Sequence, residues 1–279
     1  MDWQIHTLQL LESVRMEKIT SFFQIITATA EGGFILISLV IIYWCVNKDL
    51  GLRLSFIIIF NTITNIMLKN IIRAPRPFDE GVVKPIRAHT ATGYSFPSGH
   101  TQSATAFWLS LMRYLKEKWL YCLGSIMIIL VALSRLYLGV HWPVDIMGAL
   151  FVGVTFTILG ECIVRRVSQV ANLYLLILGL LLVTSILFLP NDNYVKSIGA
   201  LLGFIIGNLI EEKYICYQVD GPLTYQIGKV IVGFLVLIIL TIALKIILPS
   251  ILICNLVRYM IIVLWIIAGA PYTFGRMKP

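Results

Sequence analysis

Three short polar segments carry the residue types in this chain that could do chemistry. Each lies at the end of a long apolar run, where ionisable groups are costly and usually functional. The candidate residues are Lys69, Arg76, Ser98, Gly99, His100, Arg135, His141 and Asp145. Three permanent cations, two histidines and one carboxylate together indicate a site that binds phosphate and reacts with it.

Lys69, Arg76 and Arg135 are the candidate phosphate ligands with a permanent charge. Phosphoryl transfer asks a protein mainly to position the group and to neutralise charge on its oxygens. Arginine offers a planar fork that matches these oxygens, and lysine offers a point charge. Cations at span ends also serve as interfacial anchors, but Arg135 ends a span on the side that should be poor in cations. We therefore expect all three to bind phosphate.

Ser98, Gly99 and His100 stand directly before an apolar run that begins at 101. A serine can cap the start of a helix, and glycine lets a ligand approach the backbone. The free amides of a helix N-terminus bind anions. Capping alone would explain Ser98 and Gly99, but not a histidine there with Pro97 fixing the turn. We expect Ser98 and Gly99 to bind phosphate and His100 to be catalytic.

His141 and Asp145 flank Pro143, which suits the first turn of a helix. Asp145 would then lie in that turn, within reach of His141. A carboxylate that accepts one ring N–H leaves the other nitrogen free as a nucleophile. His-x-x-x-Asp alone is more often structural. The catalytic interpretation is favoured here because His141 and Asp145 are expected on the same side of the membrane as His100 and the three cations.

These residues predict a two-step mechanism without a metal or another cofactor. His141 attacks phosphorus and forms a phosphohistidine, while protonated His100 donates to the leaving oxygen and then takes a proton from water. Vanadate should inhibit. Near the site only Asp79, Glu80 and Asp145 are acidic, too few for a two-metal carboxylate cage.

The composition indicates a polytopic membrane protein. Of the 279 residues, 58% are hydrophobic and only 13% are charged, which is too apolar for a soluble globule. The net charge of +8 does not indicate nucleic-acid binding, because no block of basic residues could follow a nucleic-acid backbone. Five cysteines without a paired motif are expected to be inert.

The fold class expected is all-α, a transmembrane helix bundle preceded by an amphipathic interfacial helix within residues 5–26. A further span in 5–26 is the alternative. About nine spans are predicted at 31–46, 51–72, 101–115, 119–140, 143–164, 171–189, 195–210, 230–248 and 251–270. The expected organisation is an N-terminal interfacial helix (1–30), a phosphatase core (31–165) and accessory transmembrane helices (166–279).

Loop charges predict the orientation. In the nine-span arrangement one side collects Lys48, Arg53, Arg113, Lys116, Lys118, Arg165, Arg166, Lys213, Lys229, Arg276 and Lys278. The positive-inside rule makes that side cytoplasmic. All three polar segments then face the extracytoplasmic side, and the plasma membrane is the expected location.

Two features of the C-terminal part lie outside this chemistry. Gly199, Gly203 and Gly207 recur every four residues, a spacing that lets helices approach closely. Packing within the chain is favoured over a dimer face, and the oligomeric state is left open. The stretch 211–215 is interpreted as a solvated helix end with no chemistry.

The three segments also resemble the motifs of a known family. Residues 69–77 read K-x6-R-P, residues 97–100 read P-S-G-H, and residues 134–145 read S-R-x5-H-x3-D. They match all three motifs of the type 2 phosphatidic acid phosphatase superfamily over about 30–165. This superfamily includes lipid phosphate phosphatases, undecaprenyl-diphosphatases, glucose-6-phosphatase and vanadium haloperoxidases. The resemblance implies the same roles for the eight candidate residues.

The leading hypothesis is a membrane phosphatase acting on a phosphorylated lipid, with polyprenyl diphosphate as the first guess and phosphatidate or a similar lipid next. The bilayer and that lipid are the expected partners. Three alternatives stay open: a phosphotransferase to an alcohol, a sugar-phosphate phosphatase resembling glucose-6-phosphatase, and an anion or lipid transporter without catalysis. The transporter is disfavoured because transport alone needs no His–Asp pair with a second histidine.

Overall fold

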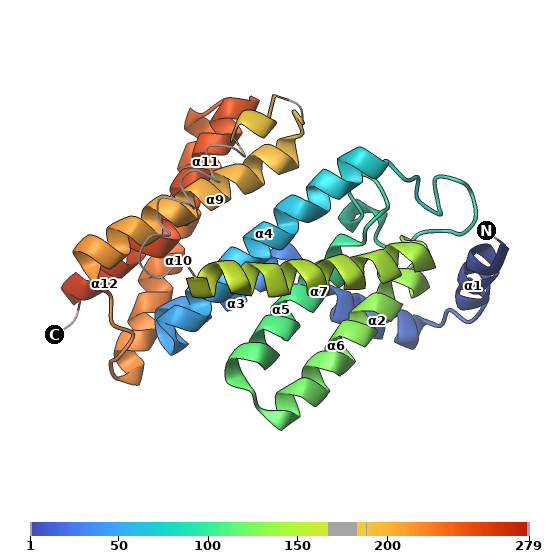
Figure 1. The fold of residues 1–279 in the computed structure, drawn as a ribbon, viewed down its shortest axis with the longest axis horizontal. Helices are drawn as coiled ribbons and strands as arrows, with labels where there is room; N and C mark the ends of the chain where they lie inside the picture. The colour runs from blue at the N-terminus through green and yellow to red at the C-terminus, as the bar shows by residue number, and fades with distance from the viewer. Residues whose placement is uncertain (1, 167–182, 188, 278–279) are drawn as a thin grey trace. The chain divides into compact units, whose positions relative to one another are not determined.

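The computed structural model describes residues 2–166, 183–187 and 189–277, and these residues form helices, turns and loops without a β-strand (Figure 1). The all-α prediction is confirmed. The chain forms two compact units, one of residues 1–36 and 64–160, the other of 37–63 and 161–279. The division at 30 and 165 expected from the sequence stays a prediction, and each unit is described by itself.

The first unit holds every candidate site residue. Its helices are α1 (Asp2–Ser13), α2 (Glu17–Ala28), α5 (Gly99–Leu115), α6 (Lys118–Tyr137) and most of α7 (Pro143–Arg166), with the ends of α3 (Gly32–Ile41) and α4 (Lys48–Ile72). α5 and α6 form an antiparallel hairpin, and α2 packs against α6 (Figure 1). A long loop from 73 to 98 contains one 3₁₀ turn, Ala88–Thr90.

The N-terminal segment differs from the single amphipathic helix predicted over 5–26. It forms two helices, α1 and α2, separated at Met16, whose backbone is extended. The backbone N–H of Met16 donates to the Tyr137 hydroxyl at 3.1 Å, and the Arg15 side chain bonds the Tyr137 carbonyl. The Met16 N–H, which would bond a carbonyl four residues earlier in a continuous helix, thus bonds the Tyr137 side chain instead. Large apolar side chains such as Trp3 and Leu10 are exposed, as an amphipathic helix requires.

The second unit contains the C-terminal helices α9 (Asp192–Ile210), α10 (Leu223–Ile247), α11 (Leu252–Leu264) and α12 (Ala270–Met277), with the π-helical turns Ile42–Val46, Glu211–Ile215 and Trp265–Gly269. α9 and α11 lie side by side (Figure 1). A Cβ on Gly199 would lie 2.3 Å from the Leu256 carbonyl oxygen, and one on Gly203 would lie 2.3 Å from that of Met260. The prediction that these glycines serve packing within the chain is confirmed.

The interpretation of 211–215 as a solvated helix end is wrong for Glu211, whereas Glu212, Lys213 and Tyr214 are exposed. Glu211 is completely buried, and its Oε1 accepts from Lys48 Nζ at 2.7 Å and from the backbone N–H of Tyr217 at 2.6 Å. Lys229, expected in a cytoplasmic loop, lies in α10 and is also completely buried. Its ammonium donates to the Tyr217 hydroxyl and to the Trp44 carbonyl, both at 2.7 Å. Sequence position alone could not reveal these partners.

Six described helices are long and apolar enough to cross a membrane: Lys48–Ile72, Lys118–Tyr137, Pro143–Val164, Asp192–Ile215, Leu223–Ile247 and Leu252–Met277. The pair Glu17–Ala28 and Gly32–Val46, bent by 49°, would make a seventh if it counts as one span. The described part of the chain therefore holds fewer than the nine predicted spans. α5 has only 17 residues, a rise of about 25 Å against about 30 Å of hydrocarbon. The predicted span 171–189 lies largely outside the described residues.

Candidate active site

Four helix ends meet the 73–98 loop and the 138–142 turn at the candidate site. Lys69 lies in the last turn of α4, His100 in the first turn of α5, Arg135 in the last turn of α6 and Asp145 in the first turn of α7. Arg76 comes from the loop and His141 from the turn. Helix ends bring unpaired backbone groups to one place, which suits an anion site.

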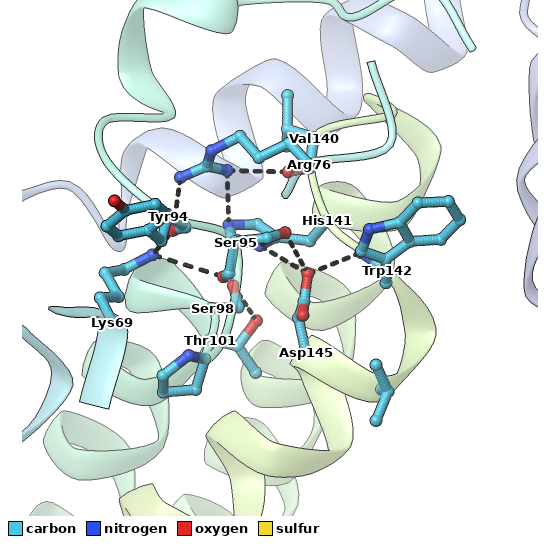
Figure 2. A network of polar contacts seen from close by, with 12 residues as sticks. Lys69, Arg76, Tyr94, Ser95, Ser98, Thr101, Val140, His141, Trp142 and Asp145 are labelled. Carbon is cyan, nitrogen blue, oxygen red and sulfur yellow. Dashed lines mark hydrogen bonds and ion pairs between the residues drawn. The ribbon is translucent and has the colours of Figure 1, made fainter. Parts of the chain in front are cut away.

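His141 and Asp145 are in contact, both almost completely buried. α7 begins at Pro143, and the His141 Nδ1 lies 3.2 Å from Asp145 Oδ2. The same oxygen accepts from the backbone N–H of Trp142 at 2.8 Å and from the Ser95 hydroxyl (Figure 2). An anionic acceptor at Nδ1 favours the tautomer with its proton there, which leaves a lone pair on Nε2.

The other ring nitrogen of His141, Nε2, faces positive charge. Its Nε2 lies 3.4 Å from Nη1 of Arg76 (Figure 2). Burial, and then the positive charges of Lys69, Arg76 and Arg135 and the His100 ring, hold the pKa of His141 well below its usual value. The ring is therefore neutral near pH 7, the state in which Nε2 is nucleophilic.

Arg76 is buried, and all five of its side-chain N–H groups have acceptors in the protein. Nε donates to Gly93 O at 2.9 Å, Nη1 to Val140 O at 2.8 Å and toward His141 Nε2, and Nη2 to Thr92 O at 3.0 Å and Tyr94 O at 3.2 Å. The sequence led us to expect a guanidinium open to phosphate. In the structure it instead fastens the 92–94 segment to the turn before His141. A phosphate bound to Arg76 would have to replace one of these carbonyls.

Lys69 points to the same segment from the end of α4. Its ammonium donates to the Tyr94 carbonyl and lies 3.3 Å from the Ser95 carbonyl. The Tyr94 oxygen thus accepts from both Lys69 and Arg76 (Figure 2). Two cations seven residues apart in the sequence thus converge on one oxygen atom, an arrangement that would also suit a phosphate oxygen.

The segment before α5 is organised differently from the expected serine cap. Ser98 occupies the N-cap position, but its hydroxyl lies 3.1 Å from the Thr101 hydroxyl and bonds no backbone amide. The alternative role of Ser98 as a side-chain cap is therefore not seen, whereas its role in phosphate binding stays a prediction. The Ser98 backbone N–H donates to the Asp145 carbonyl at 3.2 Å, which joins α5 to α7. Beside Gly99, an added Cβ would make only ordinary contact, 3.4 Å from Asn65 Oδ1.

His100 and Arg135 each present a buried nitrogen without a hydrogen-bond partner among the described residues, Nε2 and Nε respectively. Arg135 is completely buried, and its Nη1 donates to the Thr27 hydroxyl of α2 at 2.8 Å. Buried polar atoms without partners are uncommon and call for an explanation. All eight predicted site residues lie in the same unit, and the charges of four of them act on His141 or on one another.

Sequence reasoning missed two residues that shape the site. Ser95 is completely buried and donates to Asp145, and the Asn65 amide of α4 donates to Pro97 O at 3.2 Å and to Gln102 Oε1 at 2.8 Å. Ser95 stands three residues before Ser98 in the same polar segment, which is the one signal that could have indicated it. Asn65 lies inside an apolar run with no such signal.

The described residues contain no group of three or more His, Cys, Asp or Glu side chains placed to hold a metal ion.

Comparison with known families gives the context for this geometry. The model described as "PAP2 superfamily" matches residues 50–169, and that described as "PAP2 superfamily phosphatase, transmembrane extension" matches 195–279. The chain belongs to the PAP2 superfamily. The two matched regions cover the predicted site and the C-terminal helices.

Curated PAP2 relatives match at moderate identity. Sphingosine-1-phosphate phosphatase 1 of Mus musculus is 28% identical over 67% of this chain and 46% of the relative. An undecaprenyl-diphosphatase of Sulfolobus acidocaldarius is 29% identical over 38% of this chain and 52% of the relative. The chain thus spans about half the length of these relatives.

Two solved structures share the fold. The first transmembrane PAP2-type phosphatidylglycerolphosphate phosphatase from Bacillus subtilis matches with a TM-score of 0.50 and 22% identity, covering 60% of this chain and 87% of that one. Aquifex aeolicus LpxE also matches with a TM-score of 0.50 and 22% identity, covering 57% and 94%. At this identity they bear on the PAP2 fold alone.

Proposed function

We propose that this PAP2 protein is an integral membrane phosphatase that hydrolyses a phosphomonoester or diphosphate of a lipid. The observation that carries the proposal is the buried His141 ring, held by Asp145 on one side and facing the Arg76 cation with its free nitrogen. A neutral imidazole aimed into a cationic pocket is suited to attack phosphorus, because the pocket stabilises the charge of the transition state.

The proposed reaction has two steps. In the first, the lone pair of His141 Nε2 forms a bond to phosphorus while the bond from phosphorus to the lipid oxygen breaks. His100 gives that oxygen its proton, and Asp145 stabilises the positive charge that develops on the His141 ring. In the second, water gives a proton to His100 and attacks phosphorus, the N–P bond breaks, and inorganic phosphate leaves with His141 restored.

The non-bridging oxygens have candidate partners in the remaining residues. Lys69 and Arg76 already share one oxygen acceptor, the Tyr94 carbonyl. Arg135 Nε and His100 Nε2 are buried donors or acceptors that a phosphate could satisfy. The backbone amides after Ser98 at the start of α5 would add to the anion site. None of these steps uses a metal ion, and we propose that the reaction is metal-independent.

A lipid substrate is supported by the membrane character of the chain and by the names of its relatives. Those names refer to sphingosine-1-phosphate, undecaprenyl diphosphate and phosphatidylglycerolphosphate. We propose a phosphorylated lipid as the substrate class, with the site at the extracytoplasmic surface of the plasma membrane, as the loop charges indicate.

A phosphate-release screen of purified protein over lipid phosphates, lipid diphosphates and sugar phosphates tests this function. We expect release from lipids with wild-type protein, loss of at least about 1,000-fold in a His141→Ala variant, and full activity in a chelator. Asp192→Asn, in α9 of the second unit, is a matched control that should leave release unchanged. Release by His141→Ala at the wild-type rate would refute the nucleophile, and preference for a sugar phosphate would refute the substrate class. Release that requires an added alcohol would instead identify a phosphotransferase.

A further inference from the structure

The turn that carries His141 is contacted by the N-terminal helix as well as by the phosphate-binding residues. Gln4, Leu8 and Glu12 of α1, and Arg15 just after it, each bond or pack against other parts of the first unit. Gln4, Leu8 and Glu12 are spaced four residues apart, which places them on one face of α1, and Arg15 follows the end of that helix. Together these four residues touch the chain on both sides of His141.

Arg15 makes the most extensive contact with the turn. Its Nε donates to the Tyr137 carbonyl at 3.0 Å, and its Nη1 donates to the Lys84 carbonyl at 2.7 Å. Tyr137 is the last residue of α6, where a cation is favourable beside unpaired carbonyls. A Cβ on Gly139 would lie only 2.7 Å from Arg15 Nη2, so the guanidinium lies directly against the turn. Gly139 has a φ of +69°, a conformation that favours glycine.

Glu12 and Arg15 together make a second contact, with the backbone of Lys84. Its Oε1 accepts from the Lys84 backbone N–H at 2.9 Å and from Arg15 Nη1 at 3.0 Å. The two side chains thus hold both backbone polar groups of Lys84. Two residues later, the N–H of Ile86 donates to the Leu138 carbonyl at 2.9 Å. The loop at 84–86 therefore ties α1 to the turn a second time.

Leu8 and Gln4 reach the chain beyond His141. Leu8 is buried in a cluster with Val83 and Trp142, the residue directly after His141. Gln4 Oε1 accepts from the backbone N–H of Val144 at 3.2 Å, in the first turn of α7. α1 thereby contacts the chain before His141 through Arg15 and after it through Leu8 and Gln4.

We infer that α1 is a clamp that positions the His141 turn, with Arg15 as its principal positioning residue. The inference rests on the proposed function, because it assigns α1 a role in that reaction. Arg15 acts through the backbone of Tyr137 and Gly139 and not on the substrate. A nucleophile must be held within about 0.5 Å of its productive position, and a misplacement of about 1 Å can cost about 100-fold in rate.

The test compares Arg15→Ala and Arg15→Lys with Arg53→Ala, whose arginine pairs with Asp49 at 2.9 Å in the second unit. Arg15→Ala should lower kcat by about 10- to 100-fold and change KM by less than about threefold, since phosphate-binding residues stay in place. Inhibition by vanadate, which mimics five-coordinate phosphorus, should weaken in step with kcat. Arg15→Lys should recover part of kcat because an ammonium can still donate to the two carbonyls. Arg53→Ala should behave as wild type.

A second measurement is independent of activity. Hydrogen–deuterium exchange of a peptide covering 136–144 should be faster in Arg15→Ala than in wild type or Arg53→Ala, with the melting temperature of the protein little changed.

The outcomes separate the clamp from the proposed function. An active wild type whose Arg15→Ala variant keeps its kcat would overturn the clamp and leave the function standing. A fall in kcat matched by an equal loss of folded protein would also overturn it, since Arg15 would then be only structural. A wild type that releases no phosphate would overturn the function, and the exchange of 136–144 would then decide whether Arg15 holds the turn.

Discussion

His141 lies between an anion and a cation, and each controls a different ring nitrogen. Asp145 binds Nδ1 at 3.2 Å, and Arg76 lies 3.4 Å from Nε2. We expect the carboxylate to fix the tautomer and to stabilise the ring when it becomes charged, whereas burial and then the nearby cations lower the pKa of the resting ring. These two effects lead to separate predictions.

Asp145→Asn should lower kcat by about 1,000-fold while the protein remains folded. An asparagine oxygen in place of Oδ2 can still accept from the Trp142 N–H and from His141 Nδ1–H, but the side chain loses the negative charge that would stabilise the His141 ring when it becomes positively charged. Phosphate release and a melting curve measure the two effects, and Asp192→Asn in α9 is the control. An Asp145→Asn variant with near wild-type kcat would exclude this role of the carboxylate.

On the acid side of the pH profile, kcat/KM should decrease with a midpoint below about pH 6.5, the ordinary pKa of histidine. Attack requires neutral His141, and activity is lost as the pH falls through its pKa, which burial and the nearby cations lower. Lys69→Met removes one of these cations and should move this midpoint to higher pH, besides weakening binding. A wild-type midpoint at or above pH 6.5, or a midpoint that Lys69→Met leaves in place, would contradict this view of the pocket.

Ser95→Ala tests a residue that sequence reasoning missed. Its hydroxyl donates to the same Asp145 oxygen that binds His141. Loss of one hydrogen bond to a buried carboxylate is worth about 1.5–3 kcal/mol, so we expect kcat to fall by about 10- to 100-fold. Ser197→Ala, whose hydroxyl bonds a carbonyl within α9, is the control. Equal activity in the two variants would show that Ser95 does not support the pair.

At the scale of the elements, the candidate site residues lie at helix ends, whereas the faces of the helices pack against one another and stabilise the fold. The Ser98 N–H, at the N-cap of α5, donates to the Asp145 carbonyl in the first turn of α7, and this bond joins the two polar segments. In the second unit, α9 approaches α11 so closely that glycine is the residue that fits. Small residues at helix crossings play this part in membranes.

Gly203→Ala should destabilise the second unit by about 1–3 kcal/mol, because its Cβ would lie 2.3 Å from the backbone oxygen of Met260. Gly228→Ala in α10 is the matched control, since its nearest neighbour would be 3.7 Å away and alanine favours a helix. Thermal unfolding in detergent compares the two variants. Equal melting temperatures would show that the α9–α11 contact is looser than described.

At the scale of the whole molecule, we propose from the loop charges that the site faces the extracytoplasmic side. In a variant without the five native cysteines, Glu80→Cys in the 73–98 loop should react with an impermeant maleimide in intact cells. Glu117→Cys, between α5 and α6, should react only after the cells are opened. Both positions are exposed, so accessibility reports sidedness. The reverse pattern would place the site in the cytoplasm and would refute the orientation.

The sequence by itself determined the helical class, and it predicted eight site residues, all of which the structure places in the first unit. Apolar runs must become helices in a bilayer because their backbone groups have no water to bind. Polar residues at the ends of such runs need a reason to be there, and three motifs with fixed spacing supplied one. Pro143 determined where α7 begins, and with it the distance along the chain from His141 to Asp145.

Only the tertiary structure decided how these residues are held. Arg76 directs four of its five N–H donors to backbone carbonyls and the fifth toward His141 Nε2. Ser95 bonds Asp145, and Arg15, which follows α1, bonds the Tyr137 carbonyl from 122 residues earlier in the chain. Glu211 and Lys229, which looked like solvated charges, are buried because partners from distant segments reach them. Such contacts depend on which backbone atoms approach one another in space, and neither periodicity nor residue type along the chain encodes that.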